Sequence, residues 1–256
     1  MRKLFLLASV IVLCLAATAA QAKDTIKIGT EGAYPPFNRV NADGVLVGFD
    51  VDIAKALCDR MDAECEFVIQ DWDGIIPGLL AKKYDAIVAS MTMTDERREK
   101  VDFTNKYYQT PAKFMARKGS GFEITPSGLE GKIVGVQRAT VHEKFVRDQF
   151  GDSVDVRSYA TQDEANMDLA AGRLDLVIAD SVVLLPFLES TEGQDFEFVG
   201  PGYTDSKWFG DGIGIALRKE DDKLRERFNE ALAEILANGT YEKINAKYFD
   251  FNVYGE

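Results

Sequence analysis

Apolar residues along the chain occur in two patterns, as short continuous runs and as longer stretches with a single apolar face. The short runs, such as "TIKIGT" at 25–30, have the pattern of strands, and the one-sided stretches have the pattern of helices. The two patterns alternate along most of the chain. Strands are predicted at 25–30, 65–70, 84–90, 132–137, 154–159, 175–180 and 212–219, and helices at 50–61, 72–83 with a break near Pro77, 141–150, 162–173 and 221–239.

This alternation predicts an α/β protein of two small lobes, each an open, mostly parallel sheet flanked by helices. The final helix carries its apolar stripe on Leu224, Phe228, Leu232 and Ile235, and Gly239 is the expected stop. We expect this last strand and helix to return to the first lobe, which makes that lobe discontinuous in sequence.

Two segments of the chain share one shape. "LLAKKYDAIVAS" at 79–90 and "LAAGRLDLVIAD" at 169–180 each end a helix, pass through an Asp, and continue as an apolar strand. Each strand ends in a polar residue, Ser90 in the first segment and Asp180 in the second. Because ligands of open α/β sheets sit at the carboxyl ends of the strands, both residues are candidates for a binding site.

The first 22 residues have the parts of a secretory signal peptide. Two basic residues precede an apolar run at 4–15, and Ala20 and Ala22 fit the small-residue positions of a cleavage site. The run is too short to span a membrane comfortably, and no second run of that kind follows. We therefore expect residues 1–22 to be removed and the mature protein to be soluble in an exported compartment.

Charge and cysteine content narrow the possible partners. The full chain has a formal net charge of −12, and removal of two basic residues with the signal peptide brings this to about −14. Nucleic acid and anionic membranes are poor partners for such a chain. Cys58 and Cys65, the two cysteines left after processing, are expected to form a disulfide. No metal site and no cofactor is predicted, because the lone histidine, His142, is far from any other ligand in sequence.

Six segments, taken in order, resemble the periplasmic amino-acid-binding proteins of ABC importers, in the branch that handles lysine, arginine, ornithine and histidine. The likeness runs from about Thr25 to the C-terminus, and Cys58 and Cys65 also match a disulfide of that branch. The segments are "GTEGAYPPF", "GFDVDIAKALC", "YDAIVASMTMTDERREKVDFT", "VGVQRATVHEKF", "DGIGIALRKED" and "GTYEKINAKYFDF".

The resemblance implies a two-lobed clamp with a ligand cleft between the lobes. Two crossing strands would join the lobes, near 109–113 and 203–208. The predicted division is 23–110 with 206–256 for lobe 1, and 111–205 for lobe 2.

The resemblance also implies how a free amino acid is held, since its charged groups need partners once water is excluded. Arg97 matches the arginine that grips the ligand carboxylate, for which a planar guanidinium is suited. Asp180 matches the acid that pairs with the ligand ammonium, and it also fits the N-cap of a following helix. Ser90 and Thr92 match positions that bond the ligand by hydroxyl or main chain.

The loop at 137–145 is expected to offer main-chain N–H groups to the carboxylate, with Val141 at the matching position. Many relatives have a threonine there and a glycine in place of Ala139, so a side-chain hydroxyl contact is not expected. His142 is interpreted as a surface or helix-start residue, and Asp50 as a helix N-cap.

The far end of the ligand is assigned to four residues. Tyr34 and Trp72 are expected to form the walls of a slot for a flat guanidinium or an alkyl chain. Glu31 matches an acidic position that faces the tip of the ligand side chain, and Gln137 can add a hydrogen bond.

The predicted function is a monomeric transport receptor without catalysis, which captures a basic amino acid and presents it to a membrane permease. Two alternatives stay open. One is an exported enzyme on the same fold, such as a dehydratase of prephenate-like acids, because fold alone does not decide function. The other is a sensory role in which the protein feeds a membrane receptor.

Overall fold

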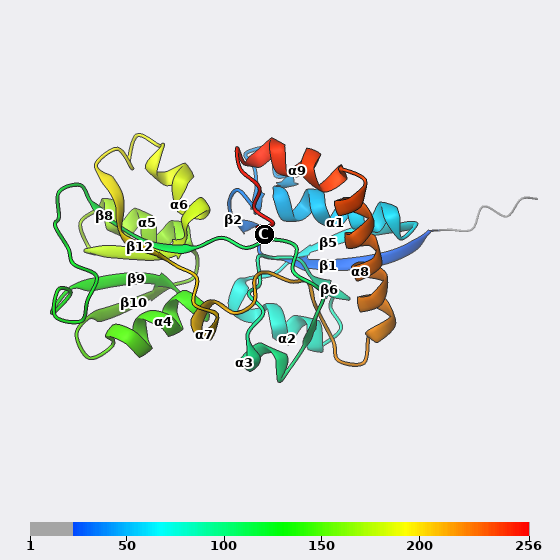
Figure 1. Cartoon of the computed structure of the whole chain (residues 1–256), viewed down its shortest axis with the longest axis horizontal. Helices are drawn as coiled ribbons and strands as arrows, with labels where there is room; N and C mark the ends of the chain where they lie inside the picture. The colour runs from blue at the N-terminus through cyan, green and yellow to red at the C-terminus, as the bar shows by residue number, and fades with distance from the viewer. Residues whose placement is uncertain (1–22, 256) are drawn as a thin grey trace, which may run out of the picture.

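The computed structural model describes residues 23–255, which form two α/β lobes side by side (Figure 1). The predicted fold class is confirmed. The predicted signal peptide, residues 1–22, lies outside the described residues. No helix within the described range is both long enough and apolar enough to cross a membrane.

The first lobe is built on a five-stranded sheet in the order β5-β1-β6-β13-β7. β1 pairs in parallel with β5 and β6, whereas β13 runs antiparallel to β6 and β7. A small antiparallel sheet, β2-β3-β4, lies beside it. The strands are β1 Asp24–Thr30, β2 Ala33–Tyr34, β3 Asn38–Val40, β4 Leu46–Val47, β5 Ala63–Ile69, β6 Ala86–Ile87, β7 Asp102–Phe103 and β13 Ala216–Leu217; the helices are α1 Phe49–Arg60, the short 3₁₀ turn η1 Trp72–Gly74, α2 Ile75–Leu80, α3 Asp95–Arg98, α8 Asp222–Ala237 and α9 Thr240–Tyr248.

The second lobe repeats this arrangement in the order β10-β9-β11-β8-β12. β9 pairs in parallel with β10 and β11, and β8 runs antiparallel to β11 and β12. Both sheets are therefore more mixed than the alternation of elements suggests. The strands are β8 Ala112–Arg117, β9 Ile133–Gln137, β10 Asp155–Tyr159, β11 Leu176–Asp180 and β12 Phe196–Tyr203; the helices are α4 Val141–Phe150, α5 Gln162–Ala170, α6 Ser181–Leu188 and α7 Ser206–Phe209.

The two segments with a shared sequence shape occupy equivalent places in the two sheets, as the third strand of each. Asp85 accepts a hydrogen bond from the Lys27 amide at 3.0 Å, and Asp175 accepts one from the Ile133 amide at 2.8 Å. Each carboxylate therefore pairs a backbone N–H group on the neighbouring parallel strand, which fixes where β6 and β11 begin beside β1 and β9.

The helix predicted with a break near Pro77 is divided slightly earlier. The 3₁₀ turn η1 ends at Gly74, and α2 starts at Ile75. Pro77 is accommodated because it lies in the first turn of α2, where a backbone N–H group has no partner inside the helix.

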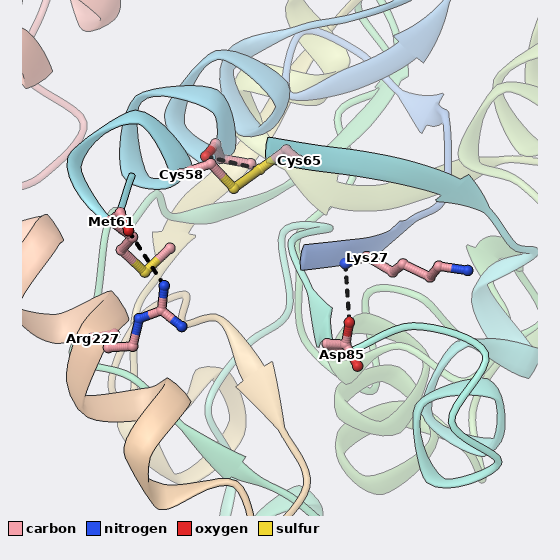
Figure 2. Close-up of a disulfide and its surroundings, with 7 residues drawn as sticks. Lys27, Cys58, Met61, Cys65, Asp85 and Arg227 are labelled. Atoms are coloured by element: carbon pink, nitrogen blue, oxygen red, sulfur yellow. Dashed lines mark hydrogen bonds between the residues drawn. A yellow bond between two sulfur atoms is a disulfide. The ribbon is translucent and has the colours of Figure 1, made fainter. Parts of the chain in front are cut away.

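The end of the chain packs on the first lobe, as expected. Phe228, Leu232 and Ile235 of α8 are buried in the same core as α1, and Gly239 follows the helix with φ +76°. The disulfide between Cys58 and Cys65 joins the last turn of α1 to β5, and Arg227 of α8 donates to the Met61 carbonyl close by (Figure 2). The predicted disulfide is confirmed.

Two chain segments pass between the lobes (Figure 1). One leads from β7 to β8, and the other leads from β12 through α7 to β13. These segments include the predicted crossings near 109–113 and 203–208. The lobe limits given above, 23–110, 111–205 and 206–256, stay a prediction.

Candidate functional site

A small cavity lies between the two lobes. All nine residues proposed from the sequence as ligand contacts line it, together with Ala89, Thr140 and His142. The nine are Glu31, Tyr34, Trp72, Ser90, Thr92, Arg97, Gln137, Val141 and Asp180.

Ser90 reaches the cavity just after β6 through an uncommon backbone conformation, with φ +54°. Its hydroxyl donates to Asp50 at 2.9 Å, and Asp50 also accepts from Asn38 and Tyr107. The hydroxyl of Ser90 is thereby engaged inside the lobe, which leaves its main chain as the group to offer to a ligand.

The prediction that Asp50 is a helix N-cap is wrong. Gly48 holds that position, and Asp50 is the second residue of α1, with no exposed surface. The reason is that three donors from β3, the loop after β6 and the segment after β7 converge on its carboxylate. Burial raises the pKa of Asp50 to about 6, against the effect of those hydrogen bonds.

Arg97 lies in α3, whose N-cap Thr94 accepts a hydrogen bond from the Arg97 amide. Its guanidinium donates to the Thr92 carbonyl at 2.9 Å and to the Ala139 carbonyl of the other lobe at 3.4 Å. The group also lies 5.2 Å from the centre of the Trp72 ring. Burial lowers the pKa of Arg97 to about 10, so the group stays cationic at neutral pH.

Trp72 also makes a hydrogen bond between the lobes. Its indole N–H donates to the Ala139 carbonyl at 3.1 Å. Tyr34 and Trp72 both line the cavity, and their proposed role as the two walls of a slot stays a prediction.

Glu31 and Gln137 are in direct contact in the wall of the cavity. The Gln137 amide donates to the Glu31 carboxylate at 2.6 Å and to the Ala160 carbonyl at 3.1 Å. Glu31 is 7% exposed. Burial raises the pKa of Glu31 to about 7, although the hydrogen bond from Gln137 opposes the shift.

Asp180 occupies the N-cap position of α6, as one reading of the sequence expected, but its side chain makes no capping hydrogen bond. Its two oxygens instead accept from the hydroxyl of Tyr34 at 2.7 Å and from that of Thr110 at 3.0 Å. The carboxylate therefore points into the region between the lobes, where it can meet a cation.

The loop before α4 turns at Ala139, which has φ +58°. Thr140 is the N-cap of α4. Val141 is the first residue of α4 and lines the cavity, so the N-terminus of the helix lies at the cavity wall. The proposed contact of its main chain with a ligand carboxylate stays a prediction. His142 is a helix-start residue as expected, but the surface alternative is wrong, because only 5% of it is exposed. The sequence analysis did not place His142 at the cavity; its position directly after Val141 is the feature of the sequence that could have indicated it.

A further contact between the lobes lies at the rim of the cavity. Arg138 and Asp73 form an ion pair of 2.5 Å with both side chains partly exposed. Across residues 23–255, no three His, Cys, Asp or Glu side chains are grouped so as to hold a metal ion.

Comparison with known proteins gives a consistent result. The family described as bacterial extracellular solute-binding proteins, family 3, matches residues 26–251. The chain is 48% identical to an L-arginine-binding protein of Pseudomonas aeruginosa over 100% of this chain and 99% of that protein. It is 43% identical to a lysine/arginine/ornithine-binding periplasmic protein of Escherichia coli, over 94% of each.

Solved structures agree with the sequence relatives. A Salmonella typhimurium periplasmic binding protein described as having high arginine specificity superimposes with a TM-score of 0.82 at 35% identity, covering 88% of this chain and 99% of the other. An ancestral amino-acid-binding protein described as a precursor of cyclohexadienyl dehydratase superimposes with a TM-score of 0.78 at 30% identity, covering 88% and 96%. The chain therefore belongs to the bacterial extracellular solute-binding proteins of family 3.

Proposed function

We propose that this protein captures a basic L-amino acid, namely arginine, lysine, ornithine or histidine, between its two lobes. The observation that carries the proposal is the content of one cavity: a cation from lobe 1, Arg97, an anion from lobe 2, Asp180, and a second buried carboxylate, Glu31. Arg97 and Asp180 match the carboxylate and ammonium of a free amino acid, and Glu31 is left to match a positive side chain. The names of the related proteins support the same ligand class.

The remaining residues have supporting roles in this proposal. Tyr34 and Trp72 contact the flat or extended part of the ligand side chain. The main chain of Ser90 and Val141, with Thr92, bonds the α-amino-acid end, and Gln137 bonds the far end beside Glu31.

A charge-removing substitution tests the ligand class. Glu31→Gln keeps the shape of the side chain and removes its charge, so a cationic ligand tip loses its partner. Breaking one partner of a buried pair costs about 3 to 5 kcal/mol, which corresponds to at least a hundredfold loss of affinity for arginine. Calorimetric titration of protein freed of carried-over ligand gives both dissociation constants.

Two controls accompany this titration. Glu64→Gln removes the same charge at an exposed position of β5 and should leave arginine affinity unchanged. Glutamine serves as a neutral ligand. If Glu31→Gln binds arginine within a few-fold of the wild type, or if the wild type prefers glutamine, the basic ligand class is wrong.

The proposed cellular role is that of a monomeric periplasmic receptor that delivers its ligand to an ABC permease. The related proteins named as periplasmic binding proteins support the compartment. Light scattering on the purified protein tests the monomeric state. Stimulation of a reconstituted permease ATPase by the loaded protein tests the delivery step.

We further propose that the protein is not an enzyme. The relatives reported above with the highest identity are named as binding proteins, whereas the solved structure described as a dehydratase precursor is 30% identical. Turnover of a prephenate-like acid, assayed beside amino-acid binding on the same preparation, tests this alternative. Measurable turnover would overturn the proposal.

A further inference from the structure

His142 is the single histidine of the 256-residue chain, and it lies in the wall of the interlobe cavity. It is the second residue of α4 and is 5% exposed. One side of its ring faces Phe209 of α7, with 5.9 Å between ring centres. The ring is thus held between the α7 segment and the cavity.

His142 is the polar side chain that α4 leaves available in the cavity. The Thr140 hydroxyl is engaged, because it donates to the Gln137 carbonyl at 2.7 Å and accepts from the Glu143 amide at 3.2 Å. Val141 has no polar side-chain atom. No hydrogen bond joins the His142 ring to another of residues 23–255, so its two nitrogens are available to a ligand.

The charged groups that act on the ring are those proposed for the α-amino-acid end of the ligand. Burial lowers the pKa of His142, nearby Asp180 opposes this shift, and Arg97 reinforces it. The imidazole is therefore neutral at neutral pH, with one N–H donor and one bare nitrogen that accepts. Because Arg97 already offers N–H donors to a carboxylate, the group that the bare nitrogen complements is the ligand ammonium.

We propose that His142 contacts the ligand directly, its bare ring nitrogen accepting a hydrogen bond from the α-ammonium group beside Asp180. This inference rests on the proposed function and adds a residue that selects for a free α-amino group. A ligand without that group leaves the His142 nitrogen unpaired in the closed cavity.

The single histidine gives a direct spectroscopic test on the wild-type protein without an affinity tag. With the histidine labelled by ¹⁵N, both ring nitrogens are observed during a titration with L-arginine. We expect the accepting nitrogen to shift on saturation, while the ring stays in one neutral tautomer. Ring signals that do not change on saturation overturn the proposal.

Variants then separate a ligand contact from a packing role. His142→Leu should weaken L-arginine binding about tenfold to a hundredfold, the usual effect of losing a hydrogen bond to a charged group. His142→Gln, which restores an acceptor, should recover most of that loss. Against 5-guanidinopentanoic acid, which is arginine without the amino group, His142→Leu should bind at least as tightly as the wild type, because the variant has no ring nitrogen to leave unpaired.

The possible failures are distinguishable. If the wild type binds no basic amino acid, the proposed function fails. If the wild type binds L-arginine and His142→Leu binds it equally well, the His142 inference fails and the proposed function stands. An equal loss for both ligands overturns the ammonium contact. Should His142→Leu not fold, His142→Gln and the wild-type ring signals still decide.

Discussion

The protonation state of Glu31 depends both on its burial and on the charge of the bound ligand. Its pKa of about 7 means that a large share of the protein carries a protonated Glu31 at neutral pH. A cationic ligand tip favours the charged carboxylate, so binding should lower this pKa and release a proton. The affinity for arginine should therefore increase from pH 6 to pH 8.

The proton release can be measured directly. Calorimetry of arginine binding at pH 7 is done in two buffers that differ in ionisation enthalpy. The difference between the two binding heats, divided by the difference in ionisation enthalpy, should correspond to the release of a fraction of one proton per site. In Glu31→Gln both this difference and the pH dependence should disappear. Equal heats for the wild type in the two buffers would contradict the assignment of Glu31.

Asp50 is a second buried carboxylate, and its effect should appear in stability. The pKa of Asp50 is raised from 3.8, the ordinary value of an aspartate, to about 6 in the folded protein. The folded state therefore binds more protons between these values, so this group makes the free energy of unfolding fall as pH rises from about 4 to about 6. Denaturant unfolding of Asp50→Asn should lack this contribution to the pH dependence.

The same substitution disturbs a hydrogen-bonded cluster. The amide of asparagine has only one acceptor oxygen, whereas Asp50 accepts from Asn38, Ser90 and Tyr107 with two oxygens. At least one buried donor therefore loses its partner. We expect Asp50→Asn to lower the free energy of unfolding at pH 7 by about 1 to 3 kcal/mol. Asp59→Asn, on an exposed position of the same helix, is the control and should change stability by less than about 0.5 kcal/mol.

At the scale of elements, the disulfide closes the connection between α1 and β5. The bond links residues seven apart in sequence, and closing so short a loop stabilises a protein by roughly 2 to 3 kcal/mol. Replacing both Cys58 and Cys65 by Ser should lower the free energy of unfolding by this amount. Reductant should destabilise the wild type similarly and leave the double variant unchanged; an effect of reductant on the variant would show another cause.

The elements themselves could be predicted because their patterns are local. Helix 141–150 is found at those residues, since Thr140 caps it and Phe145, Val146 and Phe150 face the core. Ser90 and Asp180 could be placed at the cavity because Ser90 comes just after β6 and Asp180 ends β11, the third strands of the two sheets.

The errors have a common physical origin. The sequence near Asp50 has the features of a helix start. The hydrogen-bond donors to Asp50, however, are Asn38, Ser90 and Tyr107, which come from three other segments. His142 is buried by Phe209, which is far along the chain. Contacts of this kind depend on tertiary packing, and a local pattern does not contain them.

At the scale of the whole molecule, side chains from opposite lobes meet in and around the cavity. Tyr34 bonds Asp180, Gln137 bonds Glu31, and Arg97 and Trp72 both bond the Ala139 carbonyl. A ligand that touches both Arg97 and Asp180 binds only when the lobes are close together. Ligand binding should therefore shift the population of the molecule toward this closed arrangement.

Small-angle scattering tests this closure. Saturating arginine should reduce the radius of gyration of the wild type. Arg97→Ala, which loses the proposed carboxylate contact, should show no change at the same arginine concentration. Arg138→Ala should still compact, because the exposed ion pair with Asp73 at the rim contributes at most about 1 kcal/mol. The closure mechanism would be wrong if calorimetry detects wild-type binding while the scattering profile stays the same with and without arginine.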